Sequence, residues 1–418
     1  MKKTIFRLLC ASLCLPLLFG SCGTPASDEK EPADSAESAP IETAETAETA
    51  DEPQYKWMTN EPGVYEGEVE GIDFVMNIES GKDIEILQLS DPQICSVETT
   101  RNETRHSDFQ GFLSDEPMEE QFCKYARTVF EHSDPDLIVL CGDLVYGEMD
   151  DSGEHLLALI EFMDSLETPW ALCFGNHDNE SQKGVMWQIE QFENSKYCVF
   201  KQGSVTGNSN YNIVFRQDGE IKYTAYMIDT HGCKVLDRGA GILEDNPDFD
   251  IACISSGIYD DQIEWFVESN KAIQTLAGRE TVPNVVFQHI SPNAMHLALN
   301  EKYQPKDLSA VLRLRQEGDF GYMTQGIKVN GGVDKDGTFD QACRENGTLG
   351  IFCGHNHNND ASIEWNGMRY TYGSKSSTYD SYTGTMLGGT QIFLDAEESG
   401  LSVAHLKYVQ LMKDTNEQ

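Results

Sequence analysis

Short apolar runs recur along the chain, each of strand length and each ending in a glycine or a polar residue. They are IEILQLS (84–90), DLIVLCG (136–142), WALCFG (170–175), AYMID (225–229), NVVFQH (284–289) and GIFCGH (350–355). Helix-like stretches lie between them, at 119–132, 154–166, 182–193 and 260–276. In the second of these, Leu156, Leu157, Ile160 and Met163 are expected to form one apolar face. Strands that alternate with helices predict a layered α/β fold.

Residues with metal-binding or acid–base chemistry follow five of the six runs. They are Asp91 after the first run, Asp143 after the second, Asn176, His177 and Asp178 after the third, His289 after the fifth, and His355 and His357 after the sixth. In α/β sheets, ligands bind at the carboxyl ends of the strands. The sequence therefore predicts one site that collects these side chains.

Gathering two carboxylates in a partly buried cleft costs several kcal/mol of desolvation per ion, and bound cations offset this cost. Carboxylate, imidazole and amide ligands suit Mn, Fe or Zn. Cys141, Cys173 and Cys353 each end an apolar run, and we interpret them as packing residues, not as ligands. The site is therefore expected to hold metal ions without thiolates.

The motifs D-x-(H/Q), GD, GNHD, an isolated His and GHxH occur here in this order, and together they resemble the calcineurin-like metallophosphoesterases. The resemblance covers about residues 84–395. The segments YDDQIEWF (259–266), FQHISP (287–292) and YTYGSKSSTY (370–379) are similar to the branch with purple-acid-phosphatase-type bacterial and fungal proteins. The resemblance implies a four-layer α/β fold, with two mixed β-sheets sandwiched between helices and a two-metal centre at the strand ends.

The resemblance also implies a role for each motif residue. The implied ligands are Asp143 for both metal ions, Asp91 and His357 for the first ion, and Asn176, His289 and His355 for the second. A hydroxide between the ions would attack phosphorus. His177, oriented by Asp178, would face the leaving group as a general acid or electrostatic stabiliser. The implied activity is metal-dependent hydrolysis of phosphate esters, with monoesters favoured over diesters.

One position departs from the family pattern. Most members carry a His two residues after the first Asp, and this chain carries Gln93. Tyr146 lies in GDLVY, which matches the GDxxY pattern of purple acid phosphatases, where the phenolate binds Fe(III). Either Tyr146 supplies the missing ligand and the first ion is ferric, or Tyr146 packs in its loop and Gln93 ligates or lies beside the ligands.

The N-terminus predicts export. Lys2 and Lys3 precede an apolar stretch from about residue 5 to residue 19, which is shorter than a membrane-spanning helix. Gly20-Ser21-Cys22 resembles a bacterial lipobox, in which Cys22 would become the lipid-bearing N-terminus. The alternative is an ordinary secretory peptide that is cleaved nearby.

Three regions follow from this interpretation: a lipoprotein signal peptide at 1–21, a disordered acidic tether at 22–54 and a catalytic domain at 55–418. The tether is almost free of large apolar side chains and cannot offset its ordering entropy. We expect an exported, membrane-anchored lipoprotein of the cell envelope, either periplasmic or on the cell surface.

The net charge of −40 argues against a nucleic-acid partner, which would require a basic surface. A second function remains open, that of a non-catalytic surface lipoprotein that binds phosphate or metal. The presence of both His177 and Asp178 counts against it, because a pure binding site does not require a leaving-group pair.

Overall fold

The structure is a computed structural model. It describes residues 61–67, 69–95, 118–232, 254–305, 311–324, 332–378, 380–397 and 400–416. Residues 1–60, which contain the predicted signal peptide, Cys22 and the tether, lie outside this description. Among the residues that the structure describes, no helix combines the length and apolar character of a membrane span.

A five-stranded mixed sheet has the order β15-β14-β3-β4-β5. Strands β3, β4 and β5 are parallel, whereas β14 is antiparallel to both β3 and β15. The strand bounds are Ile84–Leu89 (β3), Leu137–Cys141 (β4), Trp170–Cys173 (β5), Gly388–Leu394 (β14) and Leu401–Lys407 (β15).

An eight-stranded mixed sheet has the order β1-β2-β6-β7-β8-β11-β13-β12. Its central strands β7, β8, β11 and β13 are parallel. The strand bounds are Gly63–Glu66 (β1), Phe74–Asn77 (β2), Tyr211–Gln217 (β6), Glu220–Ile228 (β7), Asn284–Gln288 (β8), Thr348–Cys353 (β11), Ser362–Trp365 (β12) and Met368–Tyr372 (β13). A separate ribbon pairs β9 (Leu312–Arg313) with β10 (Tyr322–Met323).

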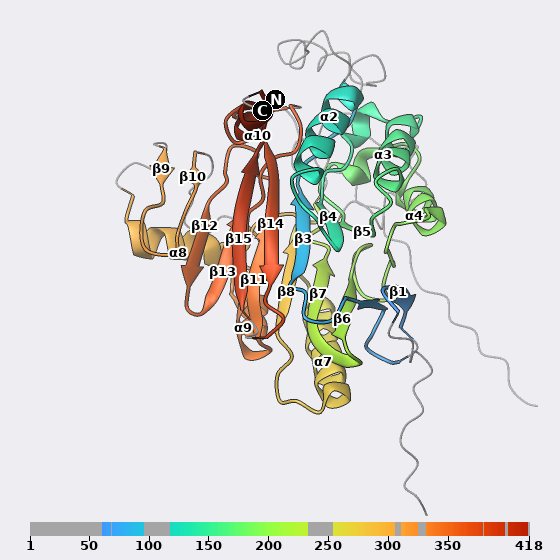
Figure 1. Cartoon of the computed structure of the whole chain (residues 1–418), viewed down its shortest axis with the longest axis vertical. Helices are drawn as coiled ribbons and strands as arrows, with labels where there is room; N and C mark the ends of the chain where they lie inside the picture. Colours follow the sequence, from blue (N-terminus) through green and yellow to red (C-terminus); the bar gives the residue numbers. More distant parts are fainter. Residues whose placement is uncertain are drawn as a thin grey trace, which may run out of the picture. The chain divides into compact units, whose positions relative to one another are not determined.

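Helices cover the outer faces of the two sheets. Helices α2, α3 and α4 lie together beside β3, β4 and β5 (Figure 1). Helices α7, α8 and α9 pack on the eight-stranded sheet. The helix bounds are Met118–Phe130 (α2), Glu154–Asp164 (α3), Val185–Asn194 (α4), Asp260–Ala277 (α7), Asn293–Tyr303 (α8), Thr338–Glu345 (α9) and Tyr408–Asn416 (α10). The predicted fold of two mixed sheets between layers of helices is confirmed.

Side chains alternate in direction along each strand, so the two faces of the eight-stranded sheet pack into two different hydrophobic cores. In β8, Val285 and Phe287 enter the core between the two sheets, while Val286 packs against the outer helices. Successive side chains of a strand point to opposite faces, so a strand buried on both faces carries consecutive apolar residues in its middle. The continuous apolar runs in the sequence therefore mark strands that are buried on both faces.

All six apolar runs coincide with strands, namely β3, β4, β5, β7, β8 and β11. The hairpin partner of β7, strand β6, was not predicted, although Asp218-Gly219 between them is a typical two-residue hairpin turn. Both turn residues have positive φ, at 53° and 84°. The remaining strands lack a continuous apolar run, and β15 is exposed or half-buried along its length.

The predicted apolar face of α3 contains one error. Leu156, Ile160 and Met163 are buried as expected, together with Leu159, but Leu157 is 46% exposed. Positions i, i+3, i+4 and i+7 share one helix face, and the residue after the first of them lies about 100° around the axis. Leu157 therefore points away from the core.

Candidate metal centre

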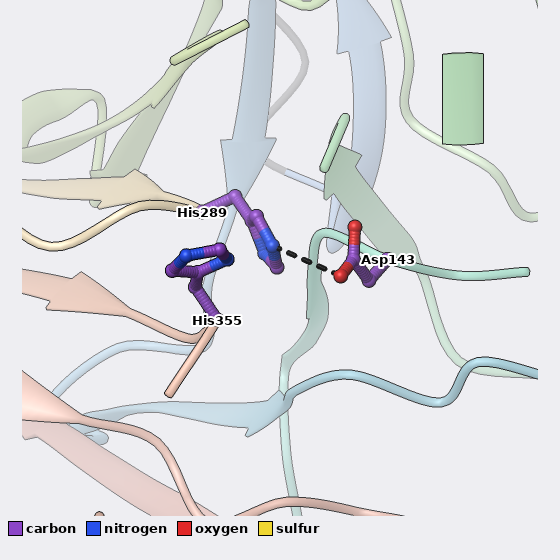
Figure 2. A group of neighbouring side chains, drawn as sticks. All are labelled: Asp143, His289 and His355. Atoms are coloured by element: carbon purple, nitrogen blue, oxygen red, sulfur yellow. Dashed lines mark ion pairs between the residues drawn. The ribbon is translucent and has the colours of Figure 1, made fainter. Parts of the chain in front are cut away.

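The strand ends of both sheets meet at one place. Asp91, Asp143 and Asn176 follow the neighbouring parallel strands β3, β4 and β5. His289 follows β8 and His355 follows β11, which are neighbours in the other sheet, and β4 contacts β8. Figure 2 shows Asp143 facing His289, with His355 beside them. The two sheets thus bring together residues that are far apart in the sequence.

The backbone at this place is unusual. Asp91, Asp143 and His355 have φ angles of 50°, 49° and 69°, in the left-handed region that residues other than glycine rarely adopt. Such conformations persist only where the surrounding structure enforces them, and they cluster at functional sites. Here the chain turns sharply after β3, β4 and β11, at the positions whose side chains form the two clusters described below.

The glycines of the motifs allow this close approach. A Cβ on Gly142 would lie 2.3 Å from His289 Nδ1, and a Cβ on Gly175 would lie 2.2 Å from the Asp143 amide nitrogen. At Gly354 the nearest atom would be Ser90 Oγ, at 2.1 Å. Each motif glycine therefore makes room for a residue of a different motif.

A first cluster consists of Asp91, Asp143 and His357, whose ligand atoms all lie within 4.8 Å of one another. His357 Nε2 lies 3.3 Å from Asp91 Oδ1, and its Nδ1 lies 3.0 Å from the main-chain oxygen of Ser381. Because a carbonyl only accepts, Nδ1 carries the proton in this contact, which leaves Nε2 as the free nitrogen of the neutral ring. This is the tautomer that binds a metal through Nε2.

A second cluster consists of Asp143, His289 and His355, again within 4.8 Å (Figure 2). His289 Nε2 lies 3.2 Å from Asp143 Oδ2, and its Nδ1 lies 3.0 Å from the main-chain oxygen of Cys141. The same tautomer therefore results at His289. Asp143 belongs to both clusters, as a carboxylate that bridges two ions would.

An orphaned polar atom indicates that these residues fit a bound cation. Asn176 Oδ1 is buried and has no hydrogen-bond partner among the described residues. Buried polar groups normally have a partner, so this amide oxygen has a place for a bound species. The thiols of Cys141, Cys173 and Cys353 are buried and free and belong to neither cluster, as predicted.

The electrostatics also match a cation site. Burial opposes ionisation of Asp143, but His289 and His177 outweigh it and hold the pKa of this carboxyl well below its usual range. Burial opposes the charged form of His289 as well, but Asp143 and Asp91 raise its pKa to about 10. Burial and the neighbouring His289 lower the pKa of His355 to about 4. In the protein alone, a proton on His289 thus balances the charge of Asp143, and metal binding would release it.

The structure gives His177 a different partner from the one expected. Its Nδ1 lies 2.8 Å from Glu180 Oε2. Asp178 instead accepts hydrogen bonds from the amides of Leu144 and Gly175, both at 2.7 Å, and from Val145 at 3.1 Å. The expectation that Asp178 orients His177 was wrong, because its carboxylate serves the two neighbouring strand-end loops.

Tyr146 is buried, and its ring stacks on His177 with centroids 4.0 Å apart. Gln93 is also buried, and its Nε2 donates to Asp143 Oδ2 at 3.2 Å. Both residues thus lie beside the clusters, and ligation by Tyr146 stays a prediction.

Sequence reasoning missed Glu180 and Lys375. Glu180 ends the short 3₁₀ helix Asp178–Glu180, so its spacing of three from His177 was the available signal. Lys375 is buried and donates to the main-chain oxygen of Asp91 at 3.0 Å. It lies in the segment YTYGSKSSTY, where a lysine among small polar residues carries no sign of burial.

A family model described as Calcineurin-like phosphoesterase matches residues 84–359. The chain belongs to the calcineurin-like phosphoesterase family. The match begins with β3 and ends just after the GHxH motif, so it includes every proposed ligand. A calcineurin-like phosphoesterase is a hydrolase, in agreement with the enzyme class that the motifs imply, and the family implies two divalent metal ions.

This calcineurin-like phosphoesterase is 24% identical over 250 residues to Phosphatase DCR2 of Saccharomyces cerevisiae, a match that covers 56% of this chain and 38% of the yeast protein. It is 25% identical over 253 residues to Probable inactive purple acid phosphatase 14 of Arabidopsis thaliana, which covers 57% of each chain. The chain therefore spans about two-fifths to three-fifths of the length of these relatives.

Solved structures that match this chain include a dimetal phosphatase from Danio rerio. It has a TM-score of 0.45 and 10% identity, and the match covers 78% of this chain and 96% of that one. The purple acid phosphatase PPD1 from yellow lupin has a TM-score of 0.38 and 9% identity, covering 81% of this chain and 57% of that one.

Proposed function

We propose that this chain hydrolyses phosphate esters at a two-metal centre and favours monoesters over diesters. The observation that supports it most is the shared carboxylate of Asp143, which belongs to both carboxylate–imidazole clusters. Asp91 and His357 would hold the first ion, and Asn176, His289 and His355 the second. Two bound ions supply a hydroxide nucleophile at neutral pH and positive charge for the phosphoryl oxygens.

His177 is the proposed general acid for the leaving group. Burial opposes its charged form, but the Glu180 and Asp143 carboxylates outweigh this and raise its pKa to about 9. The ring is therefore protonated at neutral pH, as a proton donor must be. Glu180 fixes Nδ1 and Tyr146 stacks on the ring, so Nε2 is the atom left to donate.

The metals are proposed to be Fe, Mn or Zn, with Fe(III) at the first position if Tyr146 ligates it. Protein purified with iron and showing a visible phenolate-to-iron absorption band, which Tyr146→Phe abolishes, would support the tyrosinate interpretation. Iron-loaded protein without such a band would exclude it.

The activity is tested with an aryl phosphate and an aryl phosphodiester. We expect turnover of the monoester at a higher kcat/KM, and loss of about 10²–10⁴-fold in His177→Ala. Asp143→Asn, which removes the shared carboxylate, is expected to lose both metal and activity. His132→Ala serves as the control, because His132 is exposed and lies in the turn that follows α2.

The alternative function is a non-catalytic lipoprotein that binds phosphate or metal, and the name of the Arabidopsis relative as a probable inactive phosphatase keeps it in view. Hydrolysis of neither ester by protein with confirmed bound metal would favour this alternative. A preference for the diester would overturn the monoester proposal alone.

We also propose that the chain is exported and anchored to the cell envelope through lipid on Cys22. The charged start, short apolar stretch and Gly20-Ser21-Cys22 support this proposal. The acidic segment after Cys22 would then separate the enzyme from the membrane.

A further inference from the structure

A lysine is buried behind the first cluster. Lys375 lies in the segment after β13, which pairs with the end of β3 through an isolated parallel bridge between Ser90 and Lys375. Only 1% of this residue is exposed. Lysine is almost never fully buried unless its charge is paired. Burial lowers the pKa of Lys375, and the carboxylates of Asp91, Asp380 and Asp143 act in the opposite direction and favour the ammonium form.

The ammonium group makes two directed contacts. Lys375 Nζ donates to the main-chain oxygen of Asp91 at 3.0 Å and to Gln93 Oε1 at 2.8 Å. Ser376 holds the same segment in place, since its amide and its hydroxyl both donate to the main-chain oxygen of Ser90 at 2.8 Å. The position of the lysine is therefore built into the fold and does not depend on a flexible side chain alone.

The Gln93 amide is constrained from both ends. Its Oε1 accepts from Lys375, and its Nε2 donates to Asp143 Oδ2 at 3.2 Å. An ammonium only donates and a carboxylate only accepts. If the amide were rotated by half a turn, its NH2 group would face the Lys375 ammonium and its oxygen would face the Asp143 carboxylate. Two donors would then meet at Lys375 and two acceptors at Asp143. The orientation of the amide is thus determined by its neighbours, although oxygen and nitrogen have similar shapes.

We propose that Lys375 is a positioning residue that prevents Gln93 from ligating metal and makes it a hydrogen-bond donor to Asp143. This inference rests on the proposed metal centre. The amide oxygen is the only side-chain atom of Gln93 suited to bind a cation, and it accepts a hydrogen bond from Lys375 while the amide nitrogen contacts Asp143. Gln93 therefore does not replace the histidine of the D-x-H motif as a ligand but orients the shared carboxylate.

Cobalt substitution tests this proposal, because the visible absorption of Co²⁺ depends on the number and geometry of its ligands. The wild type, Gln93→Ala, Lys375→Met and the double variant would each be loaded with Co²⁺, and metal per chain and the visible spectrum recorded. We expect Gln93→Ala to keep the number of cobalt ligands, and therefore the intensity of the visible bands, with only a small shift in their position because Asp143 loses one hydrogen-bond donor. In Lys375→Met the amide is free to turn its oxygen toward the ion, so the band intensity should change, and the double variant should return to the spectrum of Gln93→Ala.

A change in band intensity in Gln93→Ala, as expected for the loss of one ligand, would show that Gln93 is a ligand and overturn the proposal. An unchanged spectrum in Lys375→Met would overturn the role of the lysine. Lys375→Ala, which also removes the donor to Gln93 Oε1, replaces Lys375→Met if that variant does not fold. Wild-type protein that binds no Co²⁺ would overturn the metal centre itself, and with it this inference, which is a different result from altered spectra among metal-loaded variants.

Discussion

Two carboxylates follow His177 within three residues, and their contacts assign them different tasks. Glu180 contacts the imidazole, whereas Asp178 accepts hydrogen bonds from three main-chain amides in the loops after β4 and β5. Burial and the Asp143 carboxylate raise the pKa of Asp178 to about 7, against the hydrogen bonds that it accepts from Gly175 and Val145. Glu180 is thus placed to affect proton donation by His177. Asp178 instead holds the loops after β4 and β5 in place.

Substitution of Glu180 should lower turnover. In Glu180→Ala the imidazole loses both its partner and the negative charge that keeps it protonated, so we expect kcat to fall by roughly tenfold or more. Glu180→Gln can still accept from Nδ1 and should retain more activity than Glu180→Ala. Steady-state kinetics on an aryl phosphate would measure both, and equal activity of Glu180→Ala and wild type would contradict the assignment.

Substitution of Asp178 should mainly reduce stability. Asp178→Asn has a single amide oxygen for three buried amides, so at least one N–H loses its acceptor, at a cost of about 1–3 kcal/mol. Denaturant unfolding of the metal-free protein would measure the loss. Glu190→Gln is the control, because it replaces an exposed carboxylate on α4 and is expected to leave the free energy of unfolding nearly unchanged.

At the scale of the element, each strand contributes to the centre by ending abruptly. Strand β4 ends at Cys141, and Gly142, with φ of 75°, turns the chain so that Asp143 projects toward His289. The apolar strand is buried on both faces and holds this turn in place. Rigidity of the strand and freedom of the glycine are both needed, because metal ligands tolerate little displacement.

Gly142→Ala should disrupt the centre by direct contact. The new Cβ would lie 2.3 Å from His289 Nδ1, so the imidazole must move and the second cluster should lose its metal. Gly337→Ala is a matched control, because Gly337 has φ of 76° and open space around its Cβ position. We expect both variants to lose about 1–2 kcal/mol from backbone strain, but only Gly142→Ala to lose metal. Metal analysis of the two proteins would show whether they differ.

At the scale of the whole molecule, the centre links the two sheets. The first cluster takes Asp91 and Asp143 from the five-stranded sheet and His357 from the eight-stranded sheet. Bound ions would therefore add a link between strands that already meet through apolar packing and hydrogen bonds such as that from Gln88 Nε2 to the main-chain oxygen of Cys353, at 3.2 Å. Binding to the folded state alone stabilises a protein by RT ln(1 + [L]/Kd).

Removal of metal should lower the melting temperature. At a free metal concentration of about 100 times Kd, each site contributes about 2.7 kcal/mol, which a chelator would abolish. Calorimetry with and without chelator would measure the shift. Asp143→Asn should show no shift on metal addition, whereas His132→Ala should respond like the wild type. An identical melting temperature with and without bound metal would contradict this coupling.

If lipid on Cys22 anchors the protein, loss of the anchor should change where the protein partitions but leave catalysis unchanged. Full-length protein expressed in a bacterium should partition into detergent, and Cys22→Ala should move to the aqueous phase. Residues 54–418 alone should retain full metal content and kcat, because Gln54–Gln418 form one compact unit that includes all the proposed ligands. Detergent partitioning of Cys22→Ala would leave no role for lipid on this cysteine.

Local patterns were enough to predict the main strands and the residues at their ends. Asp91, Asp143 and His289 each follow a continuous apolar run, and burial of a strand on both faces requires such a run wherever it occurs. The apolar runs, together with the family resemblance, also predicted that the fold consists of mixed sheets between layers of helices. These features depend on neighbours in the sequence, which a single chain displays directly.

The partners of the site residues depended instead on contacts between distant segments. Lys375 meets Gln93 across 282 positions, and neither residue carries a local sign of the other. Whether Asp178 or Glu180 faces His177 follows from the direction of a short 3₁₀ helix, which the packing of two strand-end loops determines. The sequence specifies which chemical groups reach the sheet edge, and three-dimensional packing determines which of them touch, because hydrogen bonds and charges act over a few ångströms of space, whatever the separation along the chain.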